Sequence, residues 1–552
     1  MGQTFVYNNG SFEEKDQNSE TMEFGLFFDG TANNLYNTDA RKYAIYEKKF
    51  HNKTLSKRGK KEMHRIWEEY PEKGYAPHKY TREMLRKAYE KYKNNTSYGN
   101  DHTNVARMYL NANRIEYAIY IEGVGTGDLL KDNDLPGISH ADGEKGLLKK
   151  IKKGSEDLAK EIRKRYDLKN QGKVKNNNII LTLDVFGFSR GATAARHFLY
   201  QVSNNKRLEV KVVSLPAGNT FTTKTILTNV DESYLQIALK EVGLNELVKK
   251  INIRFVGLYD TVVSFNPIRY DIDTDFEKYI HLLHLNEIGD PMLAIHFTAL
   301  DEIREYFSLT RLVHPKAIEK NLPGAHSDVG GSYDCDGVNL YEEVILGQNL
   351  THLEELDNLK QQLINEGWYS KEELDLRDIP WPAQNELIGA RIVMGEYSYL
   401  PLLWMSKYAS FLIEKKNIDF PNIKKIYNIE TEEGNVLKEV RKHLKNTSNV
   451  ESEDTLKKVK TYLESTTFKE LTQMENGIKN IFELKTFIQK DSKVKEDWTF
   501  KSEKEQKLLK DLRHRYLHQS ASYENAGGKN SEYPFVEPNK PNEDRKRREF
   551  PA

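Results

Sequence analysis

The chain has 552 residues, enough for one large domain or several smaller ones with a sizeable core. Its 83 Lys and Arg residues balance its 83 Asp and Glu residues, so overall charge predicts no attraction to nucleic acid or to a membrane. A single cysteine, Cys335, excludes an intramolecular disulfide and favours folding in a reducing cytosol.

No targeting signal is recognisable in the sequence. The first residues lack the basic start and apolar run of a signal peptide, and residues 1–21 are predicted to form a flexible N-terminal segment. No window approaches the ~18 consecutive apolar residues of a membrane span. If the protein leaves the cell, we therefore expect a route that needs no cleaved signal.

Four short apolar runs predict buried strands. In chain order they are Phe24–Gly30, Glu116–Gly125, Asn178–Phe186 and Ile251–Asp260. Helical patterns lie between them, including Glu144–Tyr166 and Ala192–Tyr200. Alternating strands and helices predict an α/β fold, in which a mainly parallel sheet is covered on both faces. Such sheets place their chemistry at the carboxyl ends of the strands.

A basic insertion separates the first two predicted strands. Arg41–Lys93 carries an excess of roughly ten positive charges, and a helical insertion is predicted over 41–100. Two interpretations stay open: a lid or surface for anionic lipid, and an ordinary solvated pair of helices. From about Leu340 the pattern changes to long amphipathic helices with few strand signals, which predicts a helical region over 341–523. Residues 524–552 predict a flexible tail.

The pentapeptide GFSRG, from Gly187 to Gly191, has the pattern G-x-S-x-G. A nucleophilic serine on a tight strand-to-helix turn adopts a strained backbone, and the glycines leave room for that turn. The helix that begins at Arg190 directs N–H groups toward developing negative charge. The pattern alone is weak, but here it follows an apolar strand and precedes a helix, so we interpret Ser189 as a nucleophile.

A serine needs a base, and the base needs a third group to orient it. In α/β-hydrolases the chain order is Ser, then Asp or Glu, then His. After Ser189, the next predicted strand ends in Asp260, and His326 follows within a glycine-rich loop. Asp328 is only two residues from that histidine, so we expect it to shape the loop or orient a neighbour. Asp260 and His326 are the predicted acid and base.

The other histidines and one other aspartate fit these roles less well. Asp184 lies five residues before the serine, within the predicted strand. His296 and His314 have apolar or proline-bounded surroundings, which are typical of structural histidines. His281 and His284 are three residues apart, but no carboxylate cluster beside them predicts a metal site. No metal and no cofactor are therefore expected.

An oxyanion hole needs two N–H donors. The residue after the nucleophile, Arg190, supplies one through its backbone. The turn at Asp29–Thr31, which ends the first predicted strand, offers a second through the backbone of Gly30 or Thr31. The same residues also fit a simple turn without a catalytic role.

Seven motifs in one order resemble a known family. They are FFDGTANN, HTNVARMY, YIEGVGTG, VFGFSRGATAARHF, VGLYDTV, AIHFTALDEIREYF and LPGAHSDVGGSY. Together they resemble the first family of type VI secretion lipase effectors and the uncharacterised α/β-hydrolase domain on which that family is built. The resemblance covers about Phe24 to Tyr333, with weaker echoes at Gly395–Met405 and Leu512–Ala521.

The resemblance implies an α/β-hydrolase catalytic domain over 22–340 and an antibacterial phospholipase of A1 or A2 type. Its triad maps onto Ser189, Asp260 and His326, with membrane phospholipid as substrate. The family implies synthesis in the cytoplasm, carriage by a spike or tube component of type VI secretion, and delivery to the periplasm or membrane of target bacteria. It also implies a cognate immunity protein as partner. A serine esterase on another soluble or cell-wall ester, or a non-catalytic module that keeps the hydrolase fold, are the alternatives.

Overall fold

The computed structural model describes most of the chain between residues 19 and 550. The described residues are 19–72, 79–132, 145–170, 178–217, 220–263, 277–334, 341–349, 353–378, 385–429, 436–448, 500, 502–522, 547 and 549–550. A helix predicted from the apolar stripe of Leu456, Val459 and Leu463 lies outside them.

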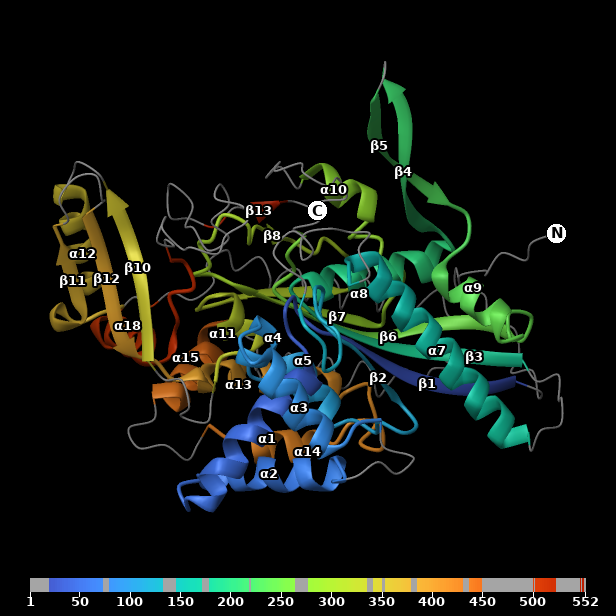
Figure 1. Cartoon of the computed structure of the whole chain (residues 1–552), viewed down its shortest axis with the longest axis horizontal. Coiled ribbons are helices and arrows are strands. Elements are labelled where there is room, and N and C mark those ends of the chain that lie inside the picture. Colours follow the sequence, from blue (N-terminus) through green and yellow to red (C-terminus); the bar gives the residue numbers. More distant parts are fainter. Residues whose placement is uncertain are drawn as a thin grey trace.

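A six-stranded parallel sheet forms the centre of the molecule, in the order β2-β1-β3-β6-β7-β9 (Figure 1). Its strands are β1 (Ser19–Phe28), β2 (Ala118–Ile121), β3 (Asn178–Phe188), β6 (Val248–Tyr259), β7 (Leu293–Ala299) and β9 (Ala317–Leu322). The predicted α/β class is confirmed, and the four predicted strands are β1, β2, β3 and β6. The remaining two, β7 and β9, escape prediction because polar residues interrupt their apolar positions, as in LAIHFTA and AIEKNL.

The strand order reverses direction once. From β1 the chain moves outward to β2 at one edge, then returns across β1 to β3 and continues through β6, β7 and β9. The switch point therefore lies between β1 and β3, whose last residues Phe28 and Gly187 are paired. In open α/β sheets, ligands bind beside the carboxyl ends of the strands at such a point.

Helices cover both faces of the sheet. α7 (Leu147–Asn170), α8 (Arg190–Asn204) and α9 (Tyr234–Glu241) form one layer, whereas α5 (Asn104–Leu110) and α13 (Tyr399–Ala409) form the other. Alternate residues of β1 serve the two cores: Phe24, Leu26 and Phe28 belong to one, and Phe27 belongs to the other. This alternation is the two-residue period of a strand buried on both faces.

The insertion is a small helical unit with its own core. It consists of α1 (Leu35–His51), α2 (Lys57–Glu69), α3 (Arg82–Tyr92) and α4 (Thr96–Gly99), packed around buried tyrosine and aliphatic side chains. Buried ion pairs join α1 to the rest of the molecule: Arg41 binds Asp334 at 2.9 Å, and Lys42 binds Asp101 at 2.7 Å. Some of the positive charge counted from the sequence is therefore internal and neutralised.

The region after residue 340 contains strands as well as helices. Its helices include α12 (Leu353–Glu366), α14 (Phe420–Ile426), α15 (Val436–Ser448) and α18 (Glu503–Tyr516). An antiparallel sheet in the order β10-β12-β11 accompanies them, with β10 (Tyr341–Asn349), β11 (Leu374–Arg377) and β12 (Asn385–Ile392). The sequence does not predict these strands because charged residues interrupt them, as in YEEVILGQN, and no continuous apolar run marks them.

Two further pairs of strands lie outside these sheets. The hairpin of β4 (Arg207–Ala217) and β5 (Thr220–Val230) projects from the body of the molecule (Figure 1). Near the end of the chain, β13 (Glu549–Phe550) pairs in parallel with β8 (Leu309–Thr310). β13 falls within the tail that the sequence predicts to be flexible, most of which lies outside the described residues.

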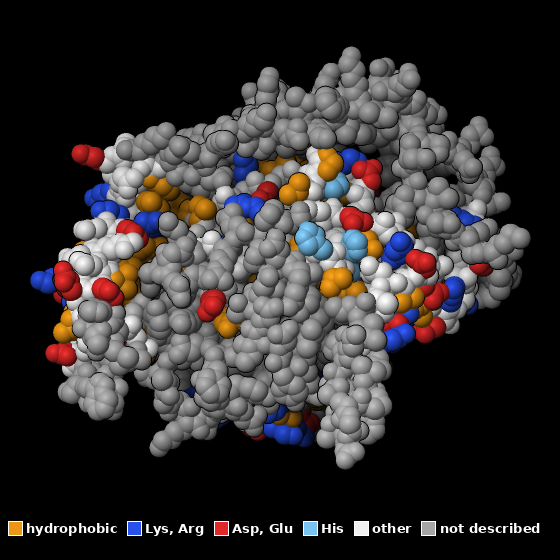
Figure 2. All heavy atoms as spheres, turned by 90° about the horizontal axis from the view of Figure 1, so that it is seen from above, with side chains coloured by type: hydrophobic (Ala, Val, Ile, Leu, Met, Phe, Trp, Pro, Cys, Tyr) orange, Lys and Arg blue, Asp and Glu red, His pale blue; other side chains and the backbone are white. Residues whose placement is uncertain are grey.

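The surface carries charges of both signs. On the face shown in Figure 2, basic and acidic side chains are interspersed among the described residues rather than gathered by sign. Within the described part of the chain, no helix is long and apolar enough to cross a membrane.

Candidate active site

Ser189 occupies a sharp turn between β3 and α8. Its backbone angles are φ 58° and ψ −129°, a conformation that L-residues rarely adopt. The flanking glycines make the turn possible: a Cβ at Gly191 would lie 2.2 Å from the carbonyl oxygen of Asp29, and one at Gly187 would lie 2.6 Å from Ala192 Cα. The Ser189 N–H donates to Tyr259 O on the neighbouring strand at 3.0 Å, which holds the turn against β6.

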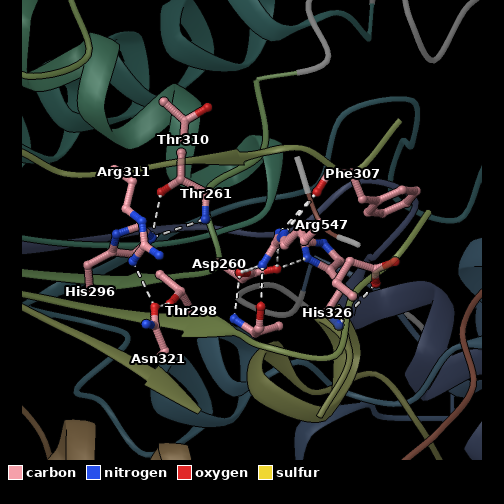
Figure 3. A network of polar contacts seen from close by, with 12 residues as sticks. Asp260, Thr261, His296, Thr298, Phe307, Thr310, Arg311, Asn321, His326 and Arg547 are labelled. Carbon is pink, nitrogen blue, oxygen red and sulfur yellow. Dashed lines mark hydrogen bonds and ion pairs between the residues drawn. The ribbon is translucent and has the colours of Figure 1, made fainter. Parts of the chain in front are cut away.

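Asp260 follows β6 directly, one strand away from the serine. It also has a positive φ, 41°, and its N–H donates to Phe297 O at 2.7 Å. Its carboxylate is fully buried; Oδ1 accepts the N–H of Ala299 at 2.8 Å, and Oδ2 lies 2.6 Å from Nδ1 of His326 (Figure 3). The structure thus brings the predicted acid and base into contact.

His326 is the first residue of the short helix α11 (His326–Gly330). Its ring packs between two aromatic rings, with centroid distances of 4.5 Å to Phe188 and 5.0 Å to Phe307. Phe188 immediately precedes Ser189, so the imidazole lies beside the serine turn. Among the described residues no hydrogen bond joins the serine hydroxyl to the imidazole, and such bonds often tighten only when substrate is bound.

Burial and charge set the ionisation of this pair in different ways. Burial alone raises the pKa of Asp260, but the charge of Arg547 and the hydrogen bond from His326 outweigh it, so this pKa lies well below its ordinary value. For His326, burial lowers the pKa more than Asp260 raises it. The imidazole is therefore neutral at pH 7 and can accept a proton.

Asp328, the competing carboxylate, contacts another histidine. Its Oδ1 lies 2.7 Å from Nδ1 of His518, and its Oδ2 accepts the N–H groups of His518 at 3.0 Å and Ala325 at 2.9 Å. The ring of His518 stacks on Tyr333 with 3.6 Å between centroids. Asp328 therefore fixes the loop before α11. Sequence reasoning missed His518, although it lies in the weak echo LRHRYLHQSA.

The turn after β1 lies against the serine turn. Thr31 Oγ1 accepts a hydrogen bond from Arg190 Nε at 2.6 Å, which connects the two turns. The N–H of Gly30 donates to the side chain of Asp29 at 2.7 Å and is engaged in this conformation. Asp29 also accepts bonds from Thr103 and Tyr120, and burial raises its pKa.

Two residues that the sequence offered as other triad candidates, Asp184 and His296, make contacts that support the fold. Asp184 is buried in β3 and binds Arg254 at 2.6 Å and Tyr117 at 2.7 Å. His296 bonds to Glu319 through Nδ1 at 2.8 Å. Its Nε2 accepts the N–H of Thr261 at 3.1 Å (Figure 3). This pair supports the backbone immediately after Asp260. In the described part of the chain, no group of three or more His, Cys, Asp or Glu residues forms a metal site.

Arg547 is the residue of the site that the sequence least predicts. Its guanidinium makes a bidentate ion pair with Asp260, at 2.6 Å to Oδ1 and 2.8 Å to Oδ2, although it lies 287 residues further along the chain (Figure 3). The surrounding sequence, NEDRKRREF, is polar and charged, which is typical of a solvated tail. No signal in the sequence marks this one arginine.

Known proteins are similar to this chain in structure and in part of its sequence. Solved structures that resemble the chain include two with low sequence identity. One, the Tle1 effector bound to the VgrG spike from the type 6 secretion system, is 17% identical with a TM-score of 0.49, covering 100% of this chain and 98% of the other. The second, an uncharacterized protein from Pseudomonas aeruginosa, is 15% identical with a TM-score of 0.35, covering 91% and 65%. No curated protein matches the chain.

A family model matches the part of the chain that holds the candidate residues. It describes the catalytic domain of the Tle1-like phospholipase effectors of the type VI secretion system and covers residues 90–353. The match includes Ser189, Asp260 and His326, and it is to a domain with lipolytic activity. Residues 90–353, which hold all three candidate residues, are therefore similar to the catalytic domain of the Tle1-like phospholipase effectors of type VI secretion.

Proposed function

We propose that the chain is a serine hydrolase that cleaves an acyl ester of membrane phospholipid, as a phospholipase A1 or A2. The observation that carries this proposal is the 2.6 Å contact between Asp260 and His326, beside a serine in a strained turn at the end of the adjacent strand. A neutral, buried imidazole held by a carboxylate is the base that an ordinary serine hydroxyl needs.

In the proposed reaction, Ser189 Oγ attacks the acyl carbonyl carbon while His326 Nε2 accepts the hydroxyl proton. Asp260 stabilises the imidazolium and holds the Nδ1–H tautomer. The tetrahedral intermediate collapses as the ester C–O bond breaks, and His326 returns its proton to the leaving lysophospholipid oxygen. Water then attacks the acyl-enzyme with His326 again as base, which releases the fatty acid and restores Ser189. Every step uses side chains of the chain itself.

The oxyanion of the intermediate needs two N–H donors. We propose the backbone of Arg190 as the first, because it opens α8 directly after the serine, where helix N–H groups point toward developing negative charge. For the second oxyanion donor, the backbone N–H of Thr31 is a better candidate than that of Gly30. The N–H of Gly30 already donates to the Asp29 side chain at 2.7 Å. Gly30 can contribute only if that contact opens when substrate binds.

The family supports the remaining parts of the proposal. The matching family model names phospholipase effectors of type VI secretion, which supports the proposal that the protein acts in the periplasm or membrane of target bacteria. We also propose a spike or tube component as its carrier and a cognate immunity protein in the producing cell.

Defined phospholipids test the activity and its position together. Pure protein should be incubated with phospholipids that carry different acyl chains at sn-1 and sn-2, and the products identified by mass spectrometry. We expect a lysolipid and one free fatty acid, whose chain assigns A1 or A2. Turnover of short soluble esters without any release of fatty acid from phospholipid would contradict the proposed substrate class.

A further inference from the structure

The guanidinium of Arg547 uses all five of its N–H groups. Two bonds reach the carboxylate of Asp260, one from each terminal nitrogen. The other three reach backbone carbonyls: Nη1 donates to Ala299 O at 2.7 Å, while Nη2 and Nε donate to Phe307 O at 3.1 and 3.2 Å. The site therefore matches the planar fork of an arginine, which a lysine cannot reproduce.

The position of this arginine is fixed by burial and by the adjacent strand. Its side chain is only 4% exposed, and a buried cation is stable only when it is paired and hydrogen-bonded. β13 begins two residues later and pairs with β8. β8 in turn bonds to the segment after Asp260, through the Thr310 N–H and Thr261 O at 2.9 Å. The end of the chain is thus docked on the backbone that carries the acid.

Asp260 Oδ2 is shared between Nδ1 of His326 and Nη2 of Arg547. A carboxylate stabilises an imidazolium through its negative charge, and a guanidinium on the same oxygens opposes that effect. We propose that Arg547 is a positioning residue that weakens His326 as a base through Asp260, so that the docked C-terminal strand restrains hydrolysis. This inference rests on the proposed function, in which His326 is the general base.

Two of the other acidic groups near the imidazole lie in pairs, and the nearby Arg190 bonds a neutral side chain. Glu302, which accepts the N–H of the histidine at 3.2 Å, binds Arg304 at 2.9 Å. Asp328, on the same helix as the histidine, binds His518 at 2.7 Å. Arg190, at the start of α8, donates to Thr31. Arg304 lowers the pKa of His326 and Glu302 raises it, so these two groups oppose each other. Arg547 differs from them because it shares the carboxylate that bonds the imidazole.

Arg547→Gln removes the charge and leaves an amide that can still bond a carbonyl. For charges roughly 6 Å apart at an effective dielectric constant of ~20, Coulomb's law gives an upper limit of about two pH units for the shift. kcat/KM for a short soluble ester should be measured from about pH 4 to pH 10. Because removal of a cation raises the pKa of the imidazole, we expect the acid limb to move upward by about one pH unit. The rate on the alkaline plateau should rise several-fold.

Three further variants show whether the effect depends on the charge of Arg547. Arg547→Lys keeps the charge, so its acid limb should stay within a few tenths of a unit of wild type. Arg377→Gln removes an exposed guanidinium on β11 and should change neither limb nor plateau. A chain that ends at Lys546 removes Arg547 and β13 together, and should raise the plateau as Arg547→Gln does. Thermal unfolding of each variant shows whether it is folded.

If Arg547→Gln does not fold, the chain that ends at Lys546 is used in its place. The reaction of this shortened chain with an organophosphonate, which labels an activated serine, can be followed against pH. We expect faster labelling on the plateau than in wild type. The inference about Arg547 would be overturned if both variants kept the wild-type acid limb and had an equal or lower plateau. The serine mechanism would still hold in that case, provided that Ser189→Ala inactivates the protein. Full activity in Ser189→Ala would instead overturn the proposed function.

Discussion

Two non-glycine residues at the ends of neighbouring strands have positive φ angles, Ser189 at 58° and Asp260 at 41°. Such backbone strain costs about 1–3 kcal/mol at each position and persists only where the surroundings hold it. Here the N–H of Ser189 bonds Tyr259 O, and the N–H of Asp260 bonds Phe297 O, so each strained residue is fastened to the next strand. Six other described non-glycine residues also have positive φ angles, but these two carry the candidate nucleophile and the candidate acid.

At this scale, Asp260→Asn tests the assignment of the acid. An amide favours the wrong tautomer of His326, so we expect kcat to fall by up to ~10⁴-fold. The substitution also leaves Arg547 buried without its counter-charge, which lowers the free energy of unfolding. Adding Arg547→Gln to this variant should restore part of the stability but not the activity. Steady-state kinetics and thermal melts measure the two effects.

Asp328→Asn is the matched control, because this carboxylate binds His518 rather than His326. Its loss should disturb the loop before α11 and lower activity much less than Asp260→Asn. If Asp328→Asn cripples the enzyme and Asp260→Asn is mild, the wrong carboxylate has been assigned.

Among the elements, the helical insertion carries two kinds of basic residue, buried and exposed. Arg41 and Lys42 of α1 are buried in ion pairs and are structural. Lys60 and Lys61 on α2 are exposed. Nearby, the rings of Phe50 and Trp67 are 44% and 37% exposed and pack edge to face with 5.3 Å between centroids. Exposed aromatic rings with lysines around them are typical of a surface that meets a lipid interface.

Replacement of Lys57, Arg58, Lys60 and Lys61 with Gln tests whether α2 contacts lipid. A cation near an anionic bilayer contributes ~1 kcal/mol, so we expect binding to anionic vesicles to weaken several-fold. Turnover of a short soluble ester should hardly change. Added salt should reduce the binding of wild type, because exposed charges are screened within ~10 Å at about 0.1 M. Vesicle co-sedimentation measures the binding.

Four lysines of α7 provide the control for this experiment. Lys149, Lys160, Lys164 and Lys169 are exposed, and their replacement with Gln removes the same number of charges from a different helix. We expect this variant to bind vesicles like wild type. Equal binding by the α2 variant at low salt would show that the insertion is an ordinary solvated helical unit.

Across the whole molecule, segments far apart in the sequence converge on the loop that carries His326. His518 binds Asp328, and Ser520 donates to Glu302 at 2.9 Å. On the other side of this loop, Asn104 donates to Val329 O and to Ser398 O, both at 2.9 Å. The C-terminal region thus supports the candidate active site in addition to packing on the sheet.

Much of this arrangement could be predicted from the sequence, because its signals are local. The central strands are continuous apolar runs, and the serine turn has two glycines at fixed positions. Ser189, Asp260 and His326 follow from chain order and from their places at strand ends and in a glycine-rich loop. These features need no knowledge of which distant segments meet.

The parts that could not be predicted depend on long-range contacts. Arg547 belongs to a basic tail in which several arginines look alike, and only the fold selects one of them. The strands β10, β11 and β12 contain charged residues, one of which, Arg391, is buried in the fold, and they resemble loops or helices in sequence. The contact of His518 with Asp328 joins residues 190 positions apart.

The same buried pairs predict how stability depends on pH. Burial alone raises the pKa of Glu302 and Glu319, but Arg304 in the first case and His296 in the second outweigh it, and both pKa values lie at about 2. Carboxyl groups with lowered pKa values stabilise the fold above their ordinary value near 4.5, and this contribution is lost as pH falls toward 2. We expect the melting temperature to fall steadily from about pH 5 downward.

Two variants separate this effect from general acid denaturation. Glu302→Gln and Glu319→Gln should each be less stable than wild type at pH 7, with a smaller difference at pH 3. Scanning calorimetry at several pH values measures it. A difference from wild type that is the same at both pH values would contradict the assigned role of the ionised carboxylates.

The proposed hydrolysis depends most on the side chain of Ser189, and a single substitution tests it. In Ser189→Ala the smaller methyl group fits the turn, so the protein should fold and melt like wild type. Hydrolysis of a defined phospholipid, followed as release of fatty acid, should fall by on the order of 10³-fold or more. A folded Ser189→Ala protein that keeps more than about a tenth of wild-type phospholipid hydrolysis would contradict the serine mechanism.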